Sequence, residues 1–495
     1  MVRRLLGCLW FAVGSLVFGL VLIAGIVYWQ FLQRGAQPQA WHETRLEDFD
    51  ASRAAEVDTL DEYLALEERL FAQLRKEVYR PADPDDPEPL NRYTTDSLSD
   101  PARWPVDWNR TYRLAPAEGV APRGAALLLH GLTDSPYSLR SIGEHLAARG
   151  YDVLGLRLPG HGTAPSGLLE FRVEDMQAAV ELAMRDLRRN GPADRPILMV
   201  GYSNGAALAV DYAMAALEDT GLPRPSGLVL ISPAIAISKF AVLARLRTGL
   251  SSVPGFARAA WQDVQLEFDP YKYNSFTFNA AGETFRLTRG VSRNVTRLAT
   301  DGVLAGFPPV IAFLSTVDST VRADAVVDVL FEHLPGDRHE LVLFDVNRLA
   351  AARALLVSDP GPLTQRLLGM PQRPFGLTVV TNVSPQSWQV HELRAPQGSA
   401  LQEDRVLALE WPSSVFSLSH VALPFPADDP LYGFAAERTE RHVQLGSVAV
   451  RGENGVLALP SWVLTRQRSN PFHGYLLERV DGFLDSVTAP ETTAR

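Results

Sequence analysis

The sequence predicts an α/β protein whose central sheet is mostly parallel and carries helices on both faces. From about residue 111 onward, short and continuous apolar runs alternate with amphipathic stretches of helical period. Strands covered on both faces read as continuous apolar runs, and helices between them imply parallel pairing. The 46% hydrophobic and 21% charged residues are typical of a folded chain, and 495 residues can bury a large core.

The expected elements follow in order along this body, which we place at residues 111–495. The predicted strands are ALLLH at 126–130, DVLGLRLP at 152–159, ILMVGYS at 197–203, GLVLISP at 227–233, PVIAFLS at 309–315 and ELVLFDV at 340–346. Helical stretches at 138–149, 172–190 and 204–217 lie between the first four of these strands. Such crossovers return the chain to the same end of the sheet.

An apolar stretch at residues 5–32 is expected to form one N-terminal transmembrane anchor. No charged residue interrupts the chain between Arg4 and Arg34, and a spanning helix needs about 20 apolar residues. A cleaved signal peptide has an apolar region of only about 7–15 residues. Because Arg3 and Arg4 precede the stretch, the positive-inside rule slightly favours a cytoplasmic N-terminus. We therefore expect attachment to a bacterial inner membrane, with the rest of the chain in the periplasm.

Residues 33–110 join this anchor to the body. Apolar residues recur at helical spacing between residues 54 and 79 and predict one amphipathic helix. The run PADPDDPEP at 81–89 cannot continue that helix, because proline lacks the amide donor that a helix requires. The pattern is compatible with docking onto the body and with a coiled coil.

Charge and cysteine content exclude several classes of protein. The net charge of −10 and the pI near 5.6 argue against a broad nucleic-acid-binding surface. A single cysteine, Cys8, cannot form an intramolecular disulfide or a thiolate metal cluster. No group of histidines and carboxylates has the spacing of a metal site, so we expect neither a metal nor an organic cofactor.

The strongest chemical signal is Gly201-Tyr202-Ser203-Asn204-Gly205, which follows an apolar strand and precedes an alanine-rich helical run. A serine on such a tight strand-to-helix turn is exposed as a nucleophile, and small neighbours permit the close backbone approach. As a bare pattern, Gly-x-Ser-x-Gly also occurs by chance, and Ser203 could be a helix N-cap. The strand before it and the helix after it favour the nucleophile.

A second segment, LLLHGLTDSPYS at 127–138, fits the same chemistry. Acyl transfer needs two backbone N–H groups to hold the oxyanion of the tetrahedral intermediate. We expect Asn204, directly after the serine, to supply one of them and Leu132 to supply the other. His130 is expected to be a packed loop residue rather than a base.

Together these pieces resemble the α/β-hydrolases, and in particular the serine hydrolases that include monoacylglycerol lipases, carboxylesterases and serine aminopeptidases. The matching segments are LLLHG, RLPGHG at 157–162, GYSNGA at 201–206 and FLSTVDSTV at 313–321, within roughly residues 110–345. The resemblance implies an α/β-hydrolase fold and a triad in the chain order serine, acid, histidine.

Asp318 is the residue expected to supply the acid of this triad. It follows the strand PVIAFLS, at the edge of the sheet where catalytic groups gather in such folds. There it would orient the histidine and stabilise the imidazolium. A helix N-cap role for Asp318 and the use of Asp324 instead are the alternatives.

The histidine departs from the simple pattern. Where the family leads from its last strand to the histidine, this chain has Asn347-Arg348. The run SVFSLSHVALPF at 414–425 resembles the family's histidine segment and indicates His420. Three other histidines that follow the strand at 340–346 are less favoured: His391, His442 and His473.

This choice leaves two insertions in the body. Residues 345–410 contain GLTVVTN at 376–382 and RVLALEW at 405–411, which would either extend the sheet or pair as an accessory hairpin. Residues 233–306 occupy the place of the family's lid and hold six aromatic residues: Trp261, Phe268, Tyr271, Tyr273, Phe276 and Phe278. These would either line an apolar substrate pocket or pack the lid's own core. The run DPYKYNSF lies within this lid and is given no catalytic role.

The sequence therefore predicts a membrane-anchored serine hydrolase that cleaves a carboxylic ester, lipid-like or other, through an acyl-enzyme. Ser203 would attack the carbonyl carbon while His420 takes its proton. The expected partners are a small acyl substrate and the membrane. A peptidase or acyltransferase of the same fold, and a non-catalytic binding module, are alternatives because a fold does not fix its chemistry.

Overall fold

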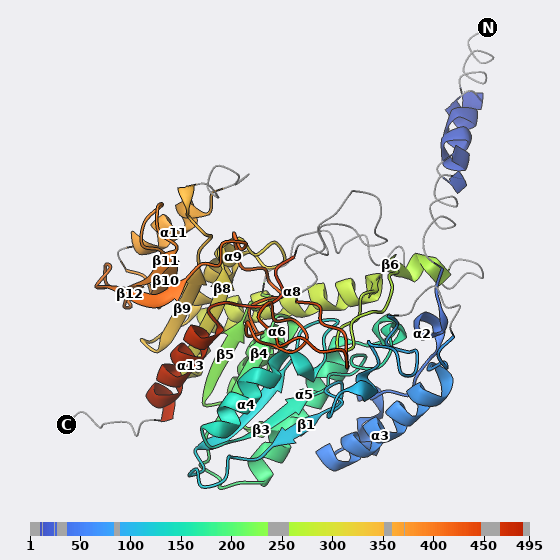
Figure 1. Cartoon of the computed structure of the whole chain (residues 1–495), viewed down its shortest axis with the longest axis horizontal. Helices are drawn as coiled ribbons and strands as arrows, with labels where there is room; N and C mark the ends of the chain where they lie inside the picture. Colours follow the sequence, from blue (N-terminus) through green and yellow to red (C-terminus); the bar gives the residue numbers. More distant parts are fainter. Residues whose placement is uncertain are drawn as a thin grey trace.

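The computed structural model describes residues 10–11, 13–23, 25–26, 37–83, 90–235, 257–350, 359–370, 372–446 and 466–488. Their strands form a ten-stranded sheet with helices on both faces, together with a small two-stranded sheet (Figure 1). The predicted α/β architecture is confirmed, and every apolar run that was predicted as a strand contains one.

The large sheet has the strand order β1-β3-β2-β4-β5-β8-β9-β10-β11-β12. Its middle is parallel from β3 to β10, whereas β1, β11 and β12 run antiparallel to their neighbours. The strands are β1 Tyr112–Leu114, β2 Gly124–Leu129, β3 Tyr151–Leu156, β4 Ile197–Tyr202, β5 Gly227–Ile231, β8 Val310–Ser315, β9 His339–Phe344, β10 Gly376–Asn382, β11 Gln389–Ala395 and β12 Glu403–Glu410. The small sheet pairs β6 Trp261–Asp263 with β7 Phe276–Thr277.

The helices cover the sheet in two layers. The α-helices are α2 Ala40–Glu43, α3 Leu60–Glu77, α4 Arg140–Ala148, α5 Val173–Arg189, α6 Asn204–Glu218, α8 Phe278–Thr300, α9 Ala323–Val329, α11 Gly361–Leu368 and α13 His473–Thr488. The short 3₁₀ segments are Ala51–Glu56, Pro101–Arg103, Pro136–Leu139, Pro165–Leu169, Ala257–Ala260, Val303–Gly306 and Phe331–His333.

Alternate residues of each central strand enter two separate cores. In β4, Ile197 and Met199 pack with the side chains of α5, α6 and α8, whereas Leu198 and Val200 pack with those of α4 and α13. Successive side chains of a strand point to opposite faces, so a strand between two helical layers must be apolar throughout. This requirement explains why these strands were visible as continuous apolar runs.

The insertion at 345–410 extends the sheet rather than forming a separate hairpin. β10 pairs in parallel with β9, and β11 and β12 continue the sheet in antiparallel fashion. The runs 376–382 and 405–411 correspond to β10 and, within a residue or two, to β12. β11 was not predicted, because three of its seven residues, His391, Glu392 and Arg394, are ionisable and no apolar run marks it.

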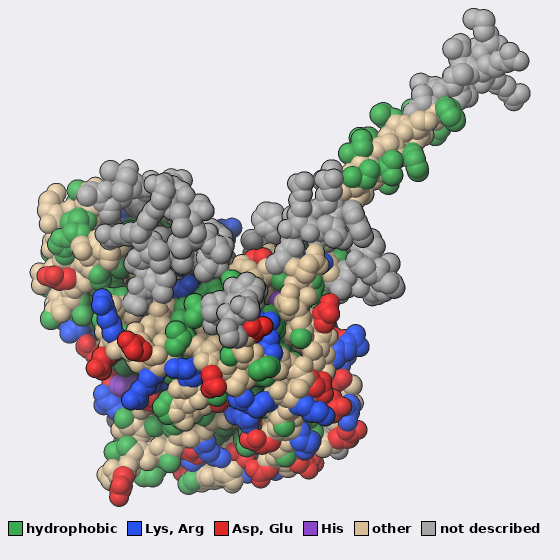
Figure 2. All heavy atoms as spheres, turned by 45° about the vertical axis from the view of Figure 1, so that its right-hand side comes forward, with side chains coloured by type: hydrophobic (Ala, Val, Ile, Leu, Met, Phe, Trp, Pro, Cys, Tyr) green, Lys and Arg blue, Asp and Glu red, His purple; other side chains and the backbone are tan. Residues whose placement is uncertain are grey.

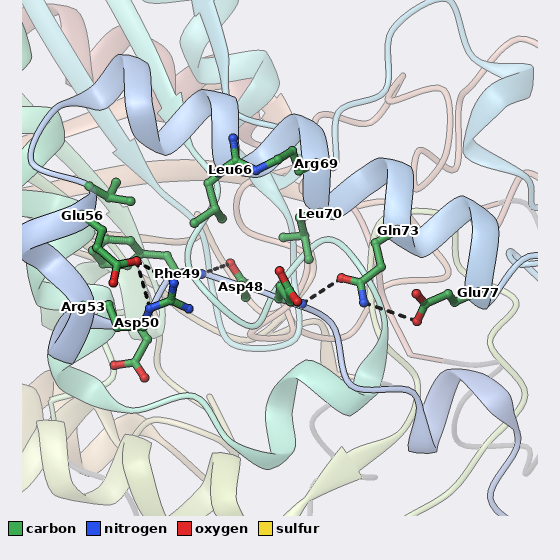
Figure 3. A pocket seen from close by; sticks show the side chains of 12 residues that line it. Asp48, Phe49, Asp50, Arg53, Glu56, Leu66, Arg69, Leu70, Gln73 and Glu77 are labelled. Atoms are coloured by element: carbon green, nitrogen blue, oxygen red, sulfur yellow. Dashed lines mark hydrogen bonds and ion pairs between the residues drawn. The ribbon is translucent and has the colours of Figure 1, made fainter.

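The segment that precedes the body packs against it. Helix α3 begins at the N-cap Thr59, whose side chain accepts a hydrogen bond from the N–H of Glu62, and it buries Leu60 and Tyr63 in the same core as α5. The coiled-coil alternative is therefore not needed to explain its apolar face. Between residues 47–57 and the second half of α3 lies a groove of about 360 Å³, where Gln73 bonds to the N–H of Glu47 and to Glu77 (Figure 3).

The expected anchor at 5–32 falls partly outside the described residues. Residues 10–26, apart from 12 and 24, are described as helical and project away from the body with apolar side chains exposed (Figures 1 and 2). The exposed fractions reach 79% at Phe11 and are 75% at Trp10 and 69% at Phe18. Among the described residues, none of the helices has the length and apolar character needed to cross a membrane.

Candidate active site

Ser203 lies on the sharp turn between β4 and α6, with the unusual backbone angles φ 53° and ψ −114°. Two glycines allow this turn. A Cβ atom at Gly201 would lie 2.4 Å from Cα of Ala206, and one at Gly205 would lie 2.0 Å from the carbonyl oxygen of Leu129. Because real Cβ atoms do not approach backbone this closely, glycine is required at both positions for the turn to hold the serine hydroxyl at the carboxyl edge of the sheet.

The structure brings the three expected triad residues into one hydrogen-bonded chain. Nε2 of His420 lies 2.9 Å from Oγ of Ser203, and Nδ1 of His420 lies 2.7 Å from Oδ2 of Asp318. All three residues are buried. The other oxygen of Asp318 accepts hydrogen bonds from the N–H groups of Thr320 and Val321, at 2.8 and 2.9 Å. This leaves Oδ2 directed at the imidazole.

His420 reaches the site although it follows the sheet extension. At the end of β9, Asn347 donates its backbone N–H to the carbonyl oxygen of Phe416 (2.9 Å) and its side-chain amide to that of Val415 (3.1 Å). Oδ1 of Asn347 in turn accepts from the side-chain amide of Asn382, which ends β10. Asn347 therefore links the sheet to the loop that carries His420. Its identity was visible in the sequence, but no pattern indicated that it would hold this loop.

The other histidines have different partners. His391 bonds to Asp404 across β11 and β12, and the ring of His442 stacks on Trp104 at 3.8 Å between centroids. His473 begins α13, where burial lowers its pKa to about 4. His339 begins β9, at the end of the sheet away from Ser203. Asp324 lies in the first turn of α9 and pairs with Arg322.

Of the two residues expected to hold an oxyanion, Asn204 directly follows Ser203 and Leu132 follows β2, the strand that pairs with β4. Asn204 is the first residue of α6, and the first N–H groups of a helix have no intrahelical partner. Leu132 lies in the turn that follows β2, which we call the oxyanion turn (Gly131–Asp134); the N–H of Asp134 closes it on the oxygen of Gly131 at 3.2 Å.

His130, immediately before that turn, is buried and acts within the loop structure. Its Nε2 accepts a hydrogen bond from the N–H of Leu158 at 3.0 Å. Burial, with the nearby His161 as a second cause, holds the pKa of His130 well below its usual value. The ring is therefore neutral and fixed, as expected for a packed loop residue.

The described part of the lid segment packs into the protein interior. Phe268 and Tyr271 join an aromatic cluster with Trp104, Tyr137 and Phe425, and Tyr273 and Trp261 are equally buried. These side chains fit the alternative in which the aromatic residues form a core. Residues 236–256 of this segment lie outside the described residues.

No metal site accompanies the serine among the residues described: no three side chains of the types His, Cys, Asp and Glu gather closely enough to hold an ion. The local groups are a hydroxyl, an imidazole, a carboxylate and backbone N–H donors. These are the components of acyl transfer by a serine nucleophile.

Comparison with known proteins points to the same chemistry. Residues 120–345 match the model of a family described as serine aminopeptidase, S33. Over 216 residues the chain is 26% identical to a thermostable monoacylglycerol lipase from Bacillus sp. (strain H-257), a match that covers 44% of this chain and 78% of that protein. The chain is a serine hydrolase of the carboxylesterase and lipase type.

Solved structures of similar proteins carry related descriptions. One is a soluble variant of monoglyceride lipase from Saccharomyces cerevisiae, with 16% identity and a TM-score of 0.38. The match covers 48% of the present chain and 82% of the yeast chain. Another is the monoacylglycerol lipase of Paleococcus ferrophilus, with 18% identity and a TM-score of 0.36, covering 48% and 88%. The sheet extension and His420 of the hydrolase lie beyond the matched family segment.

Proposed function

We propose that this hydrolase cleaves carboxylic esters through an acyl-enzyme formed on Ser203, with His420 as base and Asp318 as the orienting acid. The observation that carries the proposal is the unbroken chain of hydrogen bonds from Ser203 through His420 to Asp318. The three residues come from separate parts of the chain, and the arrangement matches the roles that a serine triad requires.

The geometry supports the following sequence of steps. Nε2 of His420 accepts the proton of Ser203 as Oγ attacks the ester carbonyl, and the N–H groups of Leu132 and Asn204 hold the oxyanion. Asp318 stabilises the imidazolium. The imidazolium then protonates the departing alkoxide, leaving an ester of Ser203. A water molecule, deprotonated by His420, attacks this ester and regenerates the free serine.

For the substrate, we propose an acyl ester with a single fatty chain. The support is the sequence similarity to a protein named as a monoacylglycerol lipase; a monoacylglycerol is such an ester. An amide substrate is the second candidate, because the matched family model is described as serine aminopeptidase.

The test uses the full chain solubilised in detergent and a fluorophosphonate probe, with the labelled peptide identified by mass spectrometry. We expect labelling at Ser203 that is abolished in Ser203→Ala and His420→Ala. We expect Asp318→Asn to lower kcat for a p-nitrophenyl ester by at least about 10³-fold, since the imidazole loses its orienting acceptor. His442→Ala, which removes a histidine stacked on Trp104, is the matched control and should label normally.

A substrate panel then separates the two candidates. Monoacylglycerols and p-nitrophenyl esters of increasing chain length are compared with aminoacyl p-nitroanilides at equal concentration. Preference for the esters supports the proposal, whereas faster cleavage of the anilides would make the chain a peptidase. Folded protein without any labelling of Ser203 would favour the non-catalytic binding module.

We also propose that residues 5–32 anchor the hydrolase in a membrane. The support is the length of the apolar stretch and the exposure of its described side chains, including Val17 at 54% and Val21 at 65%.

Replacing Val17 and Val21 by aspartate tests the anchor. The double variant carries two charges in the apolar stretch, each costing about 2.5–3.5 kcal/mol at a bilayer centre. We expect the native chain to resist extraction by alkaline carbonate and the double variant to be extracted. Leu98→Asp, at an exposed site of the segment before the body, is the control; extraction of the native chain would contradict the proposal.

A further inference from the structure

The oxyanion turn (Gly131–Asp134) contains a residue in a backbone conformation that does not suit it. Thr133 has φ 66°, in the left-handed region. Positive φ at the third position of a tight turn favours glycine or asparagine, and it is uncommon for a β-branched residue because the side chain crowds the backbone. The turn that carries Leu132 is therefore not the conformation that its own sequence prefers, and something outside it must hold it.

The segment Asp269–Asn274, which we call the clasp, contacts this turn directly. The N–H of Tyr273 donates to the carbonyl oxygen of Thr133 at 2.8 Å. Nζ of Lys272 lies 3.1 Å from Oδ1 of Asp134, whose side chain is only 5% exposed. One residue of the clasp therefore binds the strained position, and its neighbour binds the residue that closes the turn.

A third contact fixes the chain just beyond the turn. The ring of Tyr271 stacks on that of Tyr137 with centroids 4.3 Å apart and planes 6° apart. Tyr137 lies in the 3₁₀ segment Pro136–Leu139, which follows the oxyanion turn without a break in the chain. Consecutive residues 271, 272 and 273 thus hold the stretch from 133 to 137.

The clasp is itself held in one conformation. Asp269 accepts hydrogen bonds from the N–H of Tyr271 (3.0 Å) and the hydroxyl of Tyr432 (2.8 Å). The amide of Asn109 donates to the oxygen of Pro270 at 3.0 Å, and the N–H of Thr163 donates to the hydroxyl of Tyr273 at 2.7 Å. A segment tied to several other parts of the body can hold a strained turn, because strain persists only where the surroundings over-determine it.

The carboxylate of Asp134 also lies against the backbone of the turn. A Cβ atom at Gly131 would be 2.7 Å from Oδ2 of Asp134. The carboxylate therefore occupies the space that a side chain at position 131 would need, directly beside the residue that precedes Leu132. The contact of Lys272 with Oδ1 holds the carboxylate in this place.

We propose that Lys272 is a positioning residue for the oxyanion site: through Asp134 and together with the clasp, it holds the strained turn so that the N–H of Leu132 is directed at the oxyanion. This inference rests on the function proposed above and gives a role to the run DPYKYNSF. Preorganised donors need no rearrangement as charge develops, which is why their placement affects kcat more than KM.

The test is a double-mutant cycle between Lys272 and Thr133 in the full chain. Lys272→Met and Lys272→Arg are made alone and in combination with Thr133→Gly, and kcat and KM are measured for a p-nitrophenyl ester. Loss of one oxyanion donor costs about 10²–10³ in kcat, so a misdirected donor in Lys272→Met should cost about 10–100-fold, with KM changed by less than about threefold. Lys272→Arg keeps the ion pair and should recover most of kcat.

The cycle distinguishes positioning from a merely structural role. Glycine accepts positive φ without strain, so the turn no longer needs the clasp. In the Thr133→Gly background we therefore expect Lys272→Met to matter little: kcat of the double variant should lie within about threefold of kcat of Thr133→Gly alone. An equal loss in both backgrounds, or no loss in Lys272→Met, overturns the proposal. The proposal is also overturned if Asp134→Asn restores kcat of Lys272→Met and Thr133→Gly does not. The loss would then come from the unpaired charge of Asp134.

Three controls keep these outcomes separate. Arg297 on α8 forms an exposed ion pair with Glu218 on α6, with 2.7 Å between nitrogen and oxygen. Arg297→Met breaks this pair and should leave kcat unchanged. If Lys272→Met alone does not fold, as judged by thermal unfolding, the arginine variant and the combination with Thr133→Gly still decide the question. If the native chain is not labelled at Ser203, the proposed function fails; if it is labelled and the cycle shows no coupling, only the role of Lys272 fails.

Discussion

Gly205 and Gly290 are both helical glycines, but their surroundings differ completely. A Cβ atom at Gly205 would lie 2.0 Å from the oxygen of Leu129 and 2.5 Å from that of His130, whereas nothing lies within 4 Å of the corresponding position at Gly290. The contacts at Gly205 are backbone atoms of β2 and its loop, which cannot move aside as a flexible side chain can. The first turn of α6 is thus fitted to the strand beside it.

This difference predicts opposite effects for the same substitution. We expect Gly205→Ala to destabilise the fold by about 1–3 kcal/mol or more through overpacking and to abolish labelling of Ser203, because the turn must shift. Gly290→Ala in α8 should stabilise by about 0.5–1 kcal/mol, since alanine is the better helix former. Urea unfolding measures the stability of both variants, and the fluorophosphonate probe measures labelling of Ser203. Normal labelling in Gly205→Ala would contradict the geometry of the turn.

The residues of the site differ in how far the sequence could predict them. Ser203 stands in a motif with a fixed spacing, and Asp318 follows a strand, so both had local signals. His420 could be selected only by resemblance, because more than seventy residues separate it from β9. Asn347 and Lys272 stood in segments that the sequence singled out, but no signal gave either a role, since their roles depend on segments that the fold brings together from distant parts of the chain.

At the level of elements, the link between β9 and the loop of His420 depends on Asn347. We expect Asn347→Ala to lower kcat by about tenfold with KM little changed, because two hydrogen bonds that position the loop are lost. Asn190→Ala is the matched control, because its side-chain amide, at the C-cap of α5, bonds to Asp186 in the last turn of that helix. Equal kcat values for the two variants would show that the loop holds His420 without this residue.

The segment before the body is fastened by a buried cluster of charges. Arg157, whose side chain is fully buried, bonds to Asp48 at 2.7 Å and to Glu67 at 2.9 Å. Since Asp48 precedes α3 and Glu67 lies within it, one guanidinium joins both to the loop after β3. The docking of the predicted amphipathic helix thus has a polar component that hydrophobic periodicity does not reveal.

Removing this guanidinium leaves two largely buried carboxylates without their positively charged partner. We expect Arg157→Met to lower the free energy of unfolding by about 3–5 kcal/mol. Arg366→Met breaks an exposed pair with Asp328 and should cost less than about 1 kcal/mol. Chemical denaturation of the two variants makes the comparison, and a loss below about 1 kcal/mol for Arg157→Met would mean that the cluster does not hold the segment.

The elements that the sequence missed share a physical cause. β1 has three residues and lies at an edge of the sheet with intermediate or exposed side chains, and β11 buries only Val390, Glu392 and Ala395 of its seven residues. Neither needs the continuous apolar run that marks a strand buried on both sides. The buried strands β2, β3, β4, β5, β8 and β9, which do need it, were all predicted, and so was their parallel arrangement, but their order in the sheet was not.

Considered as a whole, the molecule buries several neutral histidines that an unfolded chain would protonate. Burial lowers the pKa of His161 and of His473 to about 4 and, with Arg258 as a second cause, that of His42 to about 3. Because these values lie below the unfolded value of about 6.5, the unfolded state binds more protons between pH 6.5 and 4. The stability that neutral histidines contribute is therefore present above pH 6.5 and lost as pH falls toward 4.

We accordingly expect the urea midpoint to fall steadily between pH 6.5 and 4, beginning before the carboxylates titrate. His473→Leu should make this part of the curve shallower, because Nε2 of His473 has no hydrogen-bond partner among the described residues and a neutral side chain cannot gain a proton. A flat midpoint from pH 7 to 5, or an unchanged slope in the variant, would contradict the assignment.

The late position of His420 has a consequence for the chain as it is synthesised. His420 lies 217 residues after Ser203 and 102 after Asp318, beyond the segment 120–345 that the family model matches. A ribosome therefore releases the nucleophile and the acid well before the proposed base exists. With His420 as the proposed base, we expect the nascent chain to lack activity until the sheet extension has been made, and a chain terminated after residue 345 to be released inactive.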